Sequence, residues 1–498
     1  MLLSIAAALA TGCRVDGGTA PPPPPPPPPG TLPGYYVYPP PYGSASGSGA
    51  TDDPWDLATA LAGGPARQVQ AGDTVWIRGG TYPGSFRTSL QGQPGQPIQF
   101  RQYPGERAII DGSLAAAGSE LWFVGFEIMQ SRPLQVVDRV LEANTTNGKF
   151  INLVLHDAGF SGVDLAADAG SGVELYGSII YNNGWRDNID HGIYAQNATA
   201  GTKRIRDNVI FNNFARGIQV YDDDAVALQN FEVMGNITFN NGTIATGSTE
   251  VNILISGSTL TTGMRAADNL LYYSPGEDGI QFRLGNYDVT DSAMYNKSVH
   301  LENNFAAGGR LGLEMQYQWA QATVRNNVFI GNGSMDVVHT GGPAVSAYDW
   351  SGNFYYRDPS ATAWEQDGLG YSFDDWRAAT GLGGSDSASS ALPAQTRVFV
   401  RPNQYEAGRA FIVVYNFGND NSVMVDLSGL VTTGHHYVIR NVQALFSAPV
   451  ASGTYGGGAV SIPMTGVAPP PPIGRSSPRS AQRTGPGFDV FLVTSAAP

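Results

Sequence analysis

The chain has 498 residues, including 63 glycines and 34 prolines, and its formal net charge at pH 7 is −14. This acidic balance argues against a nucleic acid or an acidic membrane surface as the partner, because either would repel the protein. The single cysteine excludes an internal disulfide framework, and no Cys/His cluster has the spacing of a zinc site.

The first residues have the pattern of an export signal. Residues 1–12 form a short apolar run that ends in small residues, and Cys13 follows directly. They resemble the signal peptide of a bacterial lipoprotein, which implies cleavage before Cys13, lipidation of its thiol and a lipid anchor in the outer membrane. The expected location is therefore secreted or on the cell surface. An incidental cysteine near the chain end is the alternative.

Residues 13–34 form the predicted linker. Pro21 to Pro29 is an unbroken proline run, which predicts a polyproline II rod of about 28 Å that holds the folded body off a surface. A short helix is expected next, with Asp53 as its N-cap, Pro54 at its first position and Gly63 at its end. Its apolar side is expected to cover the open end of the fold that follows.

The middle of the chain repeats one pattern of two short strands. SIIYNN from Ser178 and GIYAQ from Gly192 are followed by NVIFNN from Asn208 and GIQVY from Gly217. Apolar residues alternate within each half, and related segments recur at intervals of about 20–35 residues further along the chain. Repeats that cannot bury their apolar side alone indicate a stacked solenoid, here a parallel β-helix.

Two stretches of the sequence resemble a known protein family. Residues 72–82 read GDTVWIRGGTY, and residues 102–112 read QYPGERAIIDG. They resemble the opening of secreted bacterial right-handed parallel β-helix proteins of the pectate-lyase-like superfamily. DHGIYAQN, from Asp190, and the stretch through Tyr221 are similar to one bacterial branch. The resemblance implies an all-β, right-handed parallel β-helix over residues 35–390 with an N-terminal cap. It does not fix the activity, since this fold hosts lyases, hydrolases, epimerases and adhesins.

The sequence pattern of residues 391–498 predicts a second domain. Short alternating strands separated by turns indicate an antiparallel β-sandwich, and they begin near Arg397, Phe411, Val423, Tyr437, Ala459 and Val490. This domain resembles the C-terminal sandwiches of glycan-active proteins. The Pro-, Ser- and Arg-rich residues 469–485 are expected to form a flexible loop before the last strand.

Stacking places equivalent residues of successive turns about 4.8 Å apart, so the repeats predict ladders of side chains. Alignment on the repeated glycine places these residues outward: Asp164, Tyr194, Gln219, Asn252, Gln281 and Glu314. Gln196, Tyr221, Arg283 and Gln316 follow further along the same strands, and His191 and Arg216 stand just before their glycines. Such a strip resembles a groove for an extended sugar chain. The expected substrate-binding residues are Gln196, Gln219, Tyr221, Gln281, Arg283 and Glu314. A merely solvated sheet face is the alternative.

Within the strip, His191, Tyr194 and Arg216 form the expected catalytic cluster. Eliminative cleavage of a uronate requires a neutralised carboxylate, a base for the C5 proton and an acid for the leaving oxygen. Arg216 is assigned the neutralising role, His191 the base, and Tyr194 the acid or a share of the base role. A turn histidine is the alternative for His191. Local positive charge is expected from Arg186, Lys203, Arg204 and Arg206.

The sequence thus favours a monomeric polysaccharide lyase, and two other functions stay open. A hydrolase requires two carboxylates roughly 5–9.5 Å apart. Asp164 and Glu314 are expected about 24 Å apart, five strand spacings, and cannot form such a pair. A non-catalytic glycan-binding protein or adhesin is the second alternative. No cofactor is certain, but Asp222, Asp223 and Asp224 form an acidic cluster that is either a calcium site or a solvated turn.

Overall fold

The computed structural model describes residues 32–132, 139–186, 188–222, 227–245, 250–257, 259–285, 296–331, 336–340 and 348–497. The predicted signal peptide, Cys13 and the proline rod lie outside these residues. From Pro33 onward, the described chain forms one compact unit. Among the described helices, none has the length and apolarity needed to cross a bilayer.

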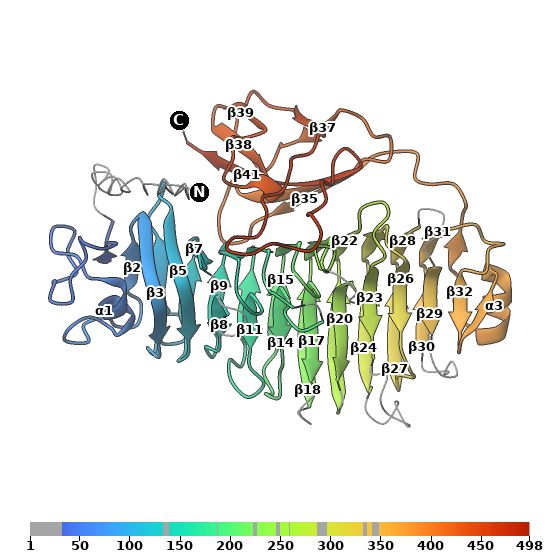
Figure 1. Ribbon diagram of the computed structural model, residues 1–498, viewed down its shortest axis with the longest axis horizontal. Helices are drawn as coiled ribbons and strands as arrows, with labels where there is room; N and C mark the ends of the chain where they lie inside the picture. Colours follow the sequence, from blue (N-terminus) through green and yellow to red (C-terminus); the bar gives the residue numbers. More distant parts are fainter. Residues whose placement is uncertain are drawn as a thin grey trace, which may run out of the picture. The chain divides into compact units, whose positions relative to one another are not determined.

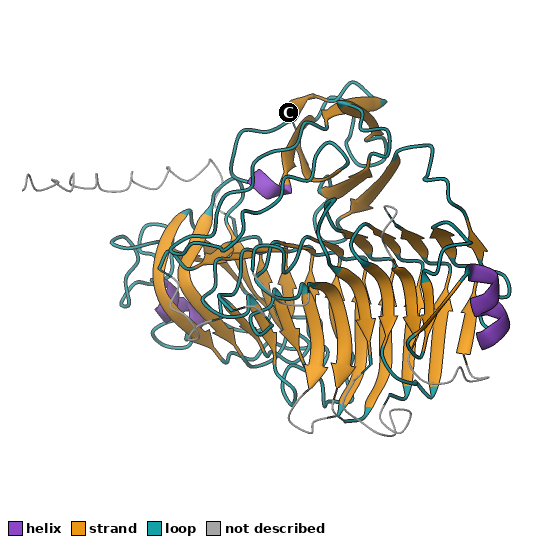
Figure 2. Ribbon diagram, turned by 45° about the vertical axis from the view of Figure 1, so that its right-hand side comes forward, coloured by secondary structure: helices purple, strands orange, loops and turns teal. Residues whose placement is uncertain are grey.

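The chain winds into a coil of short parallel strands, and most turns of the coil contain three strands (Figures 1 and 2). In many strands apolar residues occupy every second position, as at Val75 and Ile77, and these side chains enter the interior. A 12-stranded sheet, called the first sheet, forms one wall, and a 22-stranded sheet with two arms forms the rest. The first sheet contains β1 (Tyr35–Val37), β2 (Thr74–Ile77), β4 (Ile98–Gln102), β6 (Leu121–Val124), β9 (Lys149–Ile151), β12 (Glu174–Tyr176), β15 (Lys203–Arg206), β18 (Leu228–Met234), β21 (Thr261–Ala267), β24 (Ser298–Glu302), β27 (Gln321–Arg325) and β30 (Tyr348–Ser351).

Two long strands, β3 (Gly80–Thr88) and β5 (Ala108–Ala116), start both arms of the larger sheet. The dock arm then contains β7 (Glu127–Met129), β10 (Val154–His156), β13 (Ile179–Tyr181), β16 (Val209–Phe211), β19 (Ile237–Phe239), β22 (Leu270–Tyr272), β25 (Phe305–Ala307), β28 (Val328–Ile330), β31 (Phe354–Tyr356) and β34 (Ser387–Ala388). The groove arm contains β8 (Leu141–Ala143), β11 (Val163–Leu165), β14 (Ile193–Ala195), β17 (Ile218–Asp222), β20 (Val251–Gly257), β23 (Ile280–Leu284), β26 (Leu311–Met315), β29 (Asp336–Thr340) and β32 (Trp364–Gln366), with β33 (Leu369–Tyr371) antiparallel at its end.

Asparagines of the repeated motif hold successive turns together. At one bend of the coil, the amides of Asn208, Asn236, Asn269, Asn304, Asn327 and Asn353 form a continuous hydrogen-bonded ladder. All six side chains are buried. The Asn-Asn dipeptides combine two roles, since Asn212 turns the chain at φ 51° while Asn213 bonds Asn241 inside.

Helices cover both ends of the coil. The first, α1 (Leu57–Leu61), is shorter than predicted, and its N-cap is Asp56 rather than Asp53, because the Asp56 carboxylate accepts the Thr59 N–H at 2.7 Å. Leu57, Ala60 and Leu61 enter the hydrophobic core, as the end-covering role requires. At the other end, α3 (Phe373–Thr380) buries Trp376 against Trp350.

The C-terminal domain is the predicted antiparallel β-sandwich. A five-stranded sheet contains β35 (Arg397–Pro402), β36 (Ala410–Tyr415), β41 (Phe488–Ala496), β38 (His436–Asn441) and β39 (Ala451–Thr454). A two-stranded sheet contains β37 (Ser422–Asp426) and β40 (Ala459–Pro463), and a 3-10 turn, η1 (Val442–Ala444), follows β38. The domain lies along the dock arm (Figure 1), and aromatic and aliphatic side chains from both form one apolar cluster.

The loop over residues 469–485 lies on the coil rather than away from it. The Ile473 N–H donates to Asp157 at 2.7 Å, and Arg475 donates to the carbonyls of Ala158 and Asn182. Arg479 then pairs with two carboxylates of the coil. The sequence pointed to a flexible loop, because its partners are distant along the chain and only the fold brings them near.

Candidate functional site

The register of the groove arm decides which side chains are neighbours. Strand pairing aligns Asp164, Tyr194 and Gln219 as predicted, and the next positions of this ladder are Leu254, Arg283 and Glu314. The position before Asp164 is Glu142. These residues form an outward strip along the coil, one strand spacing of about 4.8 Å apart.

Asn252 and Gln281 do not belong to this strip, so their predicted outward positions are wrong. Both side chains are fully buried. They lie two residues earlier, at the bend, where the Asn252 amide donates to the Gln281 carbonyl oxygen at 2.9 Å. Gln281 in turn donates to the carbonyls of Ala307 and Gly308 at 2.8 and 2.9 Å. Gln281 is therefore a structural residue and does not face a ligand.

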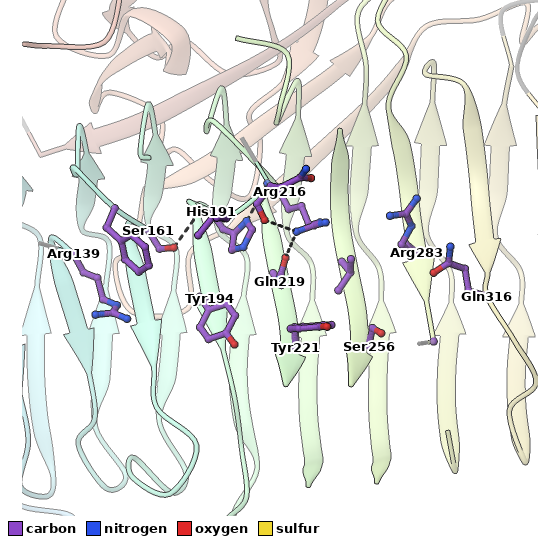
Figure 3. A pocket seen from close by; sticks show the side chains of 15 residues that line it. Arg139, Ser161, His191, Tyr194, Arg216, Gln219, Tyr221, Ser256, Arg283 and Gln316 are labelled. Carbon is purple, nitrogen blue, oxygen red and sulfur yellow. Dashed lines mark hydrogen bonds between the residues drawn. The ribbon is translucent and has the colours of Figure 1, made fainter. Parts of the chain in front are cut away.

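A cavity of about 760 Å³ opens over the middle of the strip. Seven of the residues predicted for the strip line it together, although more than a hundred positions of the sequence separate the first from the last: His191, Tyr194, Arg216, Gln219, Tyr221, Arg283 and Gln316. Gln196 and Glu314 do not line it, but each contacts a lining residue. Figure 3 shows the labelled lining residues, from Arg139 to Gln316, side by side along successive turns of the groove arm.

His191 is only 2% exposed although it lines the cavity. Its backbone N–H donates to Ser161 Oγ at 3.1 Å, and its Nδ1 accepts the Arg216 backbone N–H at 3.3 Å. Burial, and to a lesser extent the nearby Arg216 guanidinium, lower the pKa of His191 well below 6.5. The imidazole is therefore neutral and, because Nδ1 accepts, carries its proton on Nε2. That protonation does not fit the predicted base role, which needs a nitrogen lone pair facing the substrate.

Arg216 and Tyr194 are held by amide side chains. The Arg216 guanidinium donates to Gln219 Oε1 at 2.7 Å and to the Asn188 carbonyl at 3.0 Å. The Gln196 amide donates to the Tyr194 hydroxyl oxygen at 3.1 Å. Gln196 thus orients a cavity residue instead of lining the cavity itself.

Ion pairs stand at both ends of the cavity. Arg139 pairs with Asp164 at 2.6 Å and lies 4.0 Å from Glu142. At the other end, Arg283 pairs with Glu314. Glu314 therefore holds an arginine of the cavity, and it stands outside the lining.

Sequence reasoning missed several lining residues, among them Arg139, Phe160, Ser161 and Ile189. A signal existed for Ser161, because it directly precedes Gly162 just as His191 and Arg216 precede their glycines. No comparable signal existed for Arg139, which lies where the repeat pattern is interrupted.

The positive charge of the cavity has a different source from the predicted one. Arg204 and Arg206 lie on β15 of the first sheet and both pair with Glu232. Lys203 is buried, and its ammonium donates to the Gln196 and Ala166 carbonyls. Arg186 pairs with Asp190 at 2.8 Å. The arginines that line the cavity are Arg139, Arg216 and Arg283.

The predicted calcium cluster is described only at its first residue. Asp222 ends β17, is fully buried and accepts the Thr259 hydroxyl at 3.1 Å. Asp223 and Asp224 lie outside the described residues. Within the described part of the chain, no group of three or more His, Cys, Asp or Glu residues could hold a metal ion.

Comparison with known proteins bears on the fold. Residues 187–357 match a family model described as "Right handed beta helix region". An uncharacterized protein of Bacillus subtilis (strain 168), YwoF, is 37% identical over 84 residues, which is 17% of this chain and 17% of that relative. The structure of pectate lyase Pel9A has 18% identity and a TM-score of 0.45, and the match covers 64% of this chain and 78% of that one.

A mannuronic acid specific polysaccharide family 6 lyase from human gut microbiota has 16% identity and a TM-score of 0.30, with 60% of this chain and 83% of that chain covered. The family match covers most of the turns that carry the cavity, and the strand pairs between the matched turns β14, β17, β20, β23 and β26 are parallel. The central part of the chain is a right-handed parallel β-helix, as its sequence predicts.

Proposed function

We propose that the protein cleaves an acidic polysaccharide by β-elimination in the groove-arm cavity. The supporting observation is that Arg216, which donates to the neutral Gln219 amide, lines one cavity with Tyr194, while Arg139 and Arg283 line the same cavity in ion pairs with Asp164 and Glu314. A protein with a net charge of −14 attracts a polyanion poorly as a whole, so a local cluster of arginines favours an anionic ligand. An elongated strip of polar and aromatic side chains suits an extended chain of sugars.

Arg216 supplies the first requirement of this chemistry, the neutralised carboxylate. Tyr194 and Gln219 are direct neighbours across β14 and β17, and Arg216 donates to Gln219. In the proposed complex, the Arg216 guanidinium binds the uronate carboxylate and stabilises the negative charge that develops when C5 loses its proton.

Tyr194 then acts as both base and acid. Its phenolate takes the C5 proton, the C5–H electron pair forms the C4–C5 double bond, and the C4–O bond breaks. The leaving oxygen receives the proton that Tyr194 has just accepted, so protons and electrons balance within one group. Gln196 donates to the Tyr194 oxygen and so stabilises its anionic form during the exchange.

His191 has a supporting role in this proposal. With Nδ1 occupied by the Arg216 N–H, the neutral ring offers an Nε2–H donor to the substrate. The same hydrogen bond ties the backbone of Arg216 to the ring, so His191 also positions the neutralising arginine. Gln219, Tyr221 and Arg283 bind the sugars on one side of the reacting residue.

The test of the function is the product formed from uronate polymers. The protein incubated with polygalacturonate or alginate should generate the ultraviolet absorbance of unsaturated sugar ends. Tyr194→Phe should abolish this signal, and Arg216→Ala should lower kcat/KM by about 10²–10³, as expected when an electrostatic donor at the developing charge is removed. The matched control Arg204→Ala removes an arginine from the first sheet and should leave the rate unchanged.

Chelation provides a second prediction, because the proposed neutralising group is an arginine. Exhaustive dialysis against EDTA should leave the rate of elimination unchanged. Loss of the rate in EDTA with recovery on added calcium would assign neutralisation to a bound ion instead of Arg216.

One observation supports a hydrolase as the second candidate. Glu142 and Asp164 are direct neighbours on β8 and β11 and flank Arg139. A strand spacing of about 4.8 Å lies close to the roughly 5 Å separation of retaining glycosidases. Burial raises the pKa of Asp164, as an acid catalyst requires, although Arg139 opposes the shift. New reducing ends without unsaturated ends, abolished by Asp164→Asn, would favour this reading. Retention of the polymer without any product would favour a binding protein.

A further inference from the structure

A second cleft lies on the same outward strip as the cavity. Strand pairing continues from Tyr194 through Asp164 and Glu142 to Ala115 on β5 and then to Arg87 on β3. These are four strand spacings, or about 19 Å along the coil. The blue end of the groove arm in Figure 1, where β3 and β5 lie side by side, is therefore a direct extension of the candidate site.

The cleft measures about 520 Å³ and lies beside the end of α1. Leu61, Ala62 and Asn144 form part of its wall, and so does Glu142, which lies 4.0 Å from Arg139 of the central cavity. Two arginines, Arg67 and Arg87, line it from the loop after α1 and from β3.

These two arginines differ from most others of the coil. Both are exposed, and within the described residues neither guanidinium makes an ion pair or a hydrogen bond with another group. On the first sheet, by contrast, cross-strand carboxylates neutralise the arginines in the pairs Arg204–Glu232, Arg265–Glu302 and Arg325–Asp349. Two uncompensated positive charges in one cleft of an acidic protein indicate an anionic ligand.

The backbone at Arg67 supports the same reading. Arg67 has φ 54°, in the left-handed region that glycine and asparagine adopt more readily than arginine. Gly63 and Gly64 stand nearby in the same loop, where left-handed conformations cost nothing. The loop therefore presents an arginine side chain at a position where its local conformation alone does not favour one.

We propose that this cleft is a distal subsite that binds carboxylate groups of the same polysaccharide chain. The proposal rests on the proposed function, since it assumes that an acidic glycan occupies the central cavity. A chain bound from Arg87 to Arg283 would cover seven strand spacings, about 34 Å. Between the two sites, Glu142 and Asp164 share Arg139, so the formal charges of this stretch sum to −1 and it would face hydroxyl groups of the chain, not carboxylates.

Binding of long and short ligands tests the distal subsite. Affinity for polygalacturonate and for alginate would be measured at low ionic strength, together with affinity for the corresponding uronate trisaccharides. The double variant Arg67→Ala/Arg87→Ala should raise Kd for the polymer by about three- to tenfold, the effect of two exposed charge contacts. Kd for the trisaccharide, which fits the central cavity alone, should not change. In high salt the difference for the polymer should disappear.

Arg397→Ala is the matched control. Arg397 is exposed on β35 of the sandwich, and within the described chain its side chain also has no ion-pair partner, so its loss lowers the net charge by one unit, as Arg87→Ala alone does. Equal weakening by Arg397→Ala and by Arg87→Ala would overturn the proposal, because only net charge would then matter. An unchanged polymer Kd in the double variant, or equal weakening for polymer and trisaccharide, would also overturn it.

The same experiment separates this proposal from the proposed function, because binding needs no turnover. Polymer retention that depends on Arg67 and Arg87 without any product supports the distal subsite and contradicts the lyase. If the double variant carries out elimination at the parent's rate and binds the polymer with the parent's affinity, the lyase is supported and the subsite is contradicted. Arg87→Glu, which reverses the charge, should weaken polymer binding more than Arg87→Ala does.

Discussion

Glu250 and Glu277 are carboxylates of the coil that share one arginine of the sandwich loop. Arg479 donates to Glu250 at 3.2 Å and to Glu277 at 2.7 Å. Burial, and then repulsion from Glu277, raise the pKa of Glu250 to about 7 in spite of Arg479. The folded protein therefore holds a proton on Glu250 at a pH where the unfolded chain has lost it.

This shift predicts how stability depends on pH. Since the folded pKa is raised above the unfolded value near 4.5, the stabilising contribution is present at low pH and is lost as pH rises through about 7. Glu250→Gln mimics the protonated carboxyl. At pH 8 it should increase the free energy of unfolding by about 1–3 kcal/mol, a range discounted for the partial exposure of the site. At pH 5, which is close to the unfolded pKa near 4.5, the gain should be much smaller.

Denaturant titrations at the two pH values measure the difference. Glu232→Gln serves as the control. Glu232 pairs with Arg204 and Arg206, so this variant should have a lower free energy of unfolding than the parent protein at pH 8. An equal gain from Glu250→Gln at pH 5 and pH 8 would contradict the assignment of a raised pKa.

At the residue scale, the sequence predicted which residues line the cavity better than it predicted the chemical role of each one. His191, Arg216 and Tyr194 come together because repeated glycines keep the turns in register, and this could be predicted. The protonation of His191 could not, because it depends on a hydrogen bond from the next turn and on complete burial.

At the level of elements, the asparagine ladder is the main device that fixes the register of the turns. Asn269 illustrates its energetics, because its Oδ1 accepts both the backbone and the side-chain N–H of Asn236. Its Nδ2 donates to the Val233 carbonyl and to Asn304 Oδ1, both at 2.9 Å. Every polar atom of this buried amide is satisfied by another turn.

Removing one member of the ladder should therefore be costly. Asn269→Ala leaves two donors on Asn236 and the Val233 carbonyl without partners, and each buried orphan costs roughly 1–3 kcal/mol before relaxation. We expect a loss of about 2–4 kcal/mol in the free energy of unfolding. Gln321→Ala, at an exposed position of β27, should change it by less than about 0.5 kcal/mol. A loss for Asn269→Ala no larger than for Gln321→Ala would show that the ladder is not stabilising.

The ladders also explain where sequence alignment of the strands failed. Alignment on glycine gave Asn252 and Gln281 the outward position of Gln219, but β20 and β23 begin earlier in the turn. Their amides continue a second buried ladder from Asn241, which requires polar side chains at the bend. A polar residue in a strand is therefore ambiguous, since it marks either a solvated face or an internal ladder.

On the scale of the whole molecule, the sandwich and the coil share a core. Tyr181, Phe211 and Phe239 stack along the dock arm with ring centroids 5.2 and 4.8 Å apart, and all three are buried. In the SIIYNN-type repeats these aromatic residues follow directly after a residue whose side chain points into the coil, so the aromatic side chains point out of it. An outward stripe of aromatic residues signals a covering partner. That signal was present in the sequence. It shows why two domains that are separate along the chain can depend on one shared core for their stability.

The shared core predicts that the two domains unfold together. Phe488 of β41 stacks on Tyr272 with centroids 4.2 Å apart, and the Tyr415 hydroxyl donates to the Leu271 carbonyl at 3.0 Å. Calorimetry of the full chain should therefore show one cooperative transition. Phe488→Ala removes a fully buried ring and should destabilise the protein by about 3–5 kcal/mol. This loss should move the single transition down as a whole, because neither domain can keep its apolar face covered without the other. Two transitions in the parent protein, or a coil transition untouched by Phe488→Ala, would instead show that the sandwich is an independent attachment.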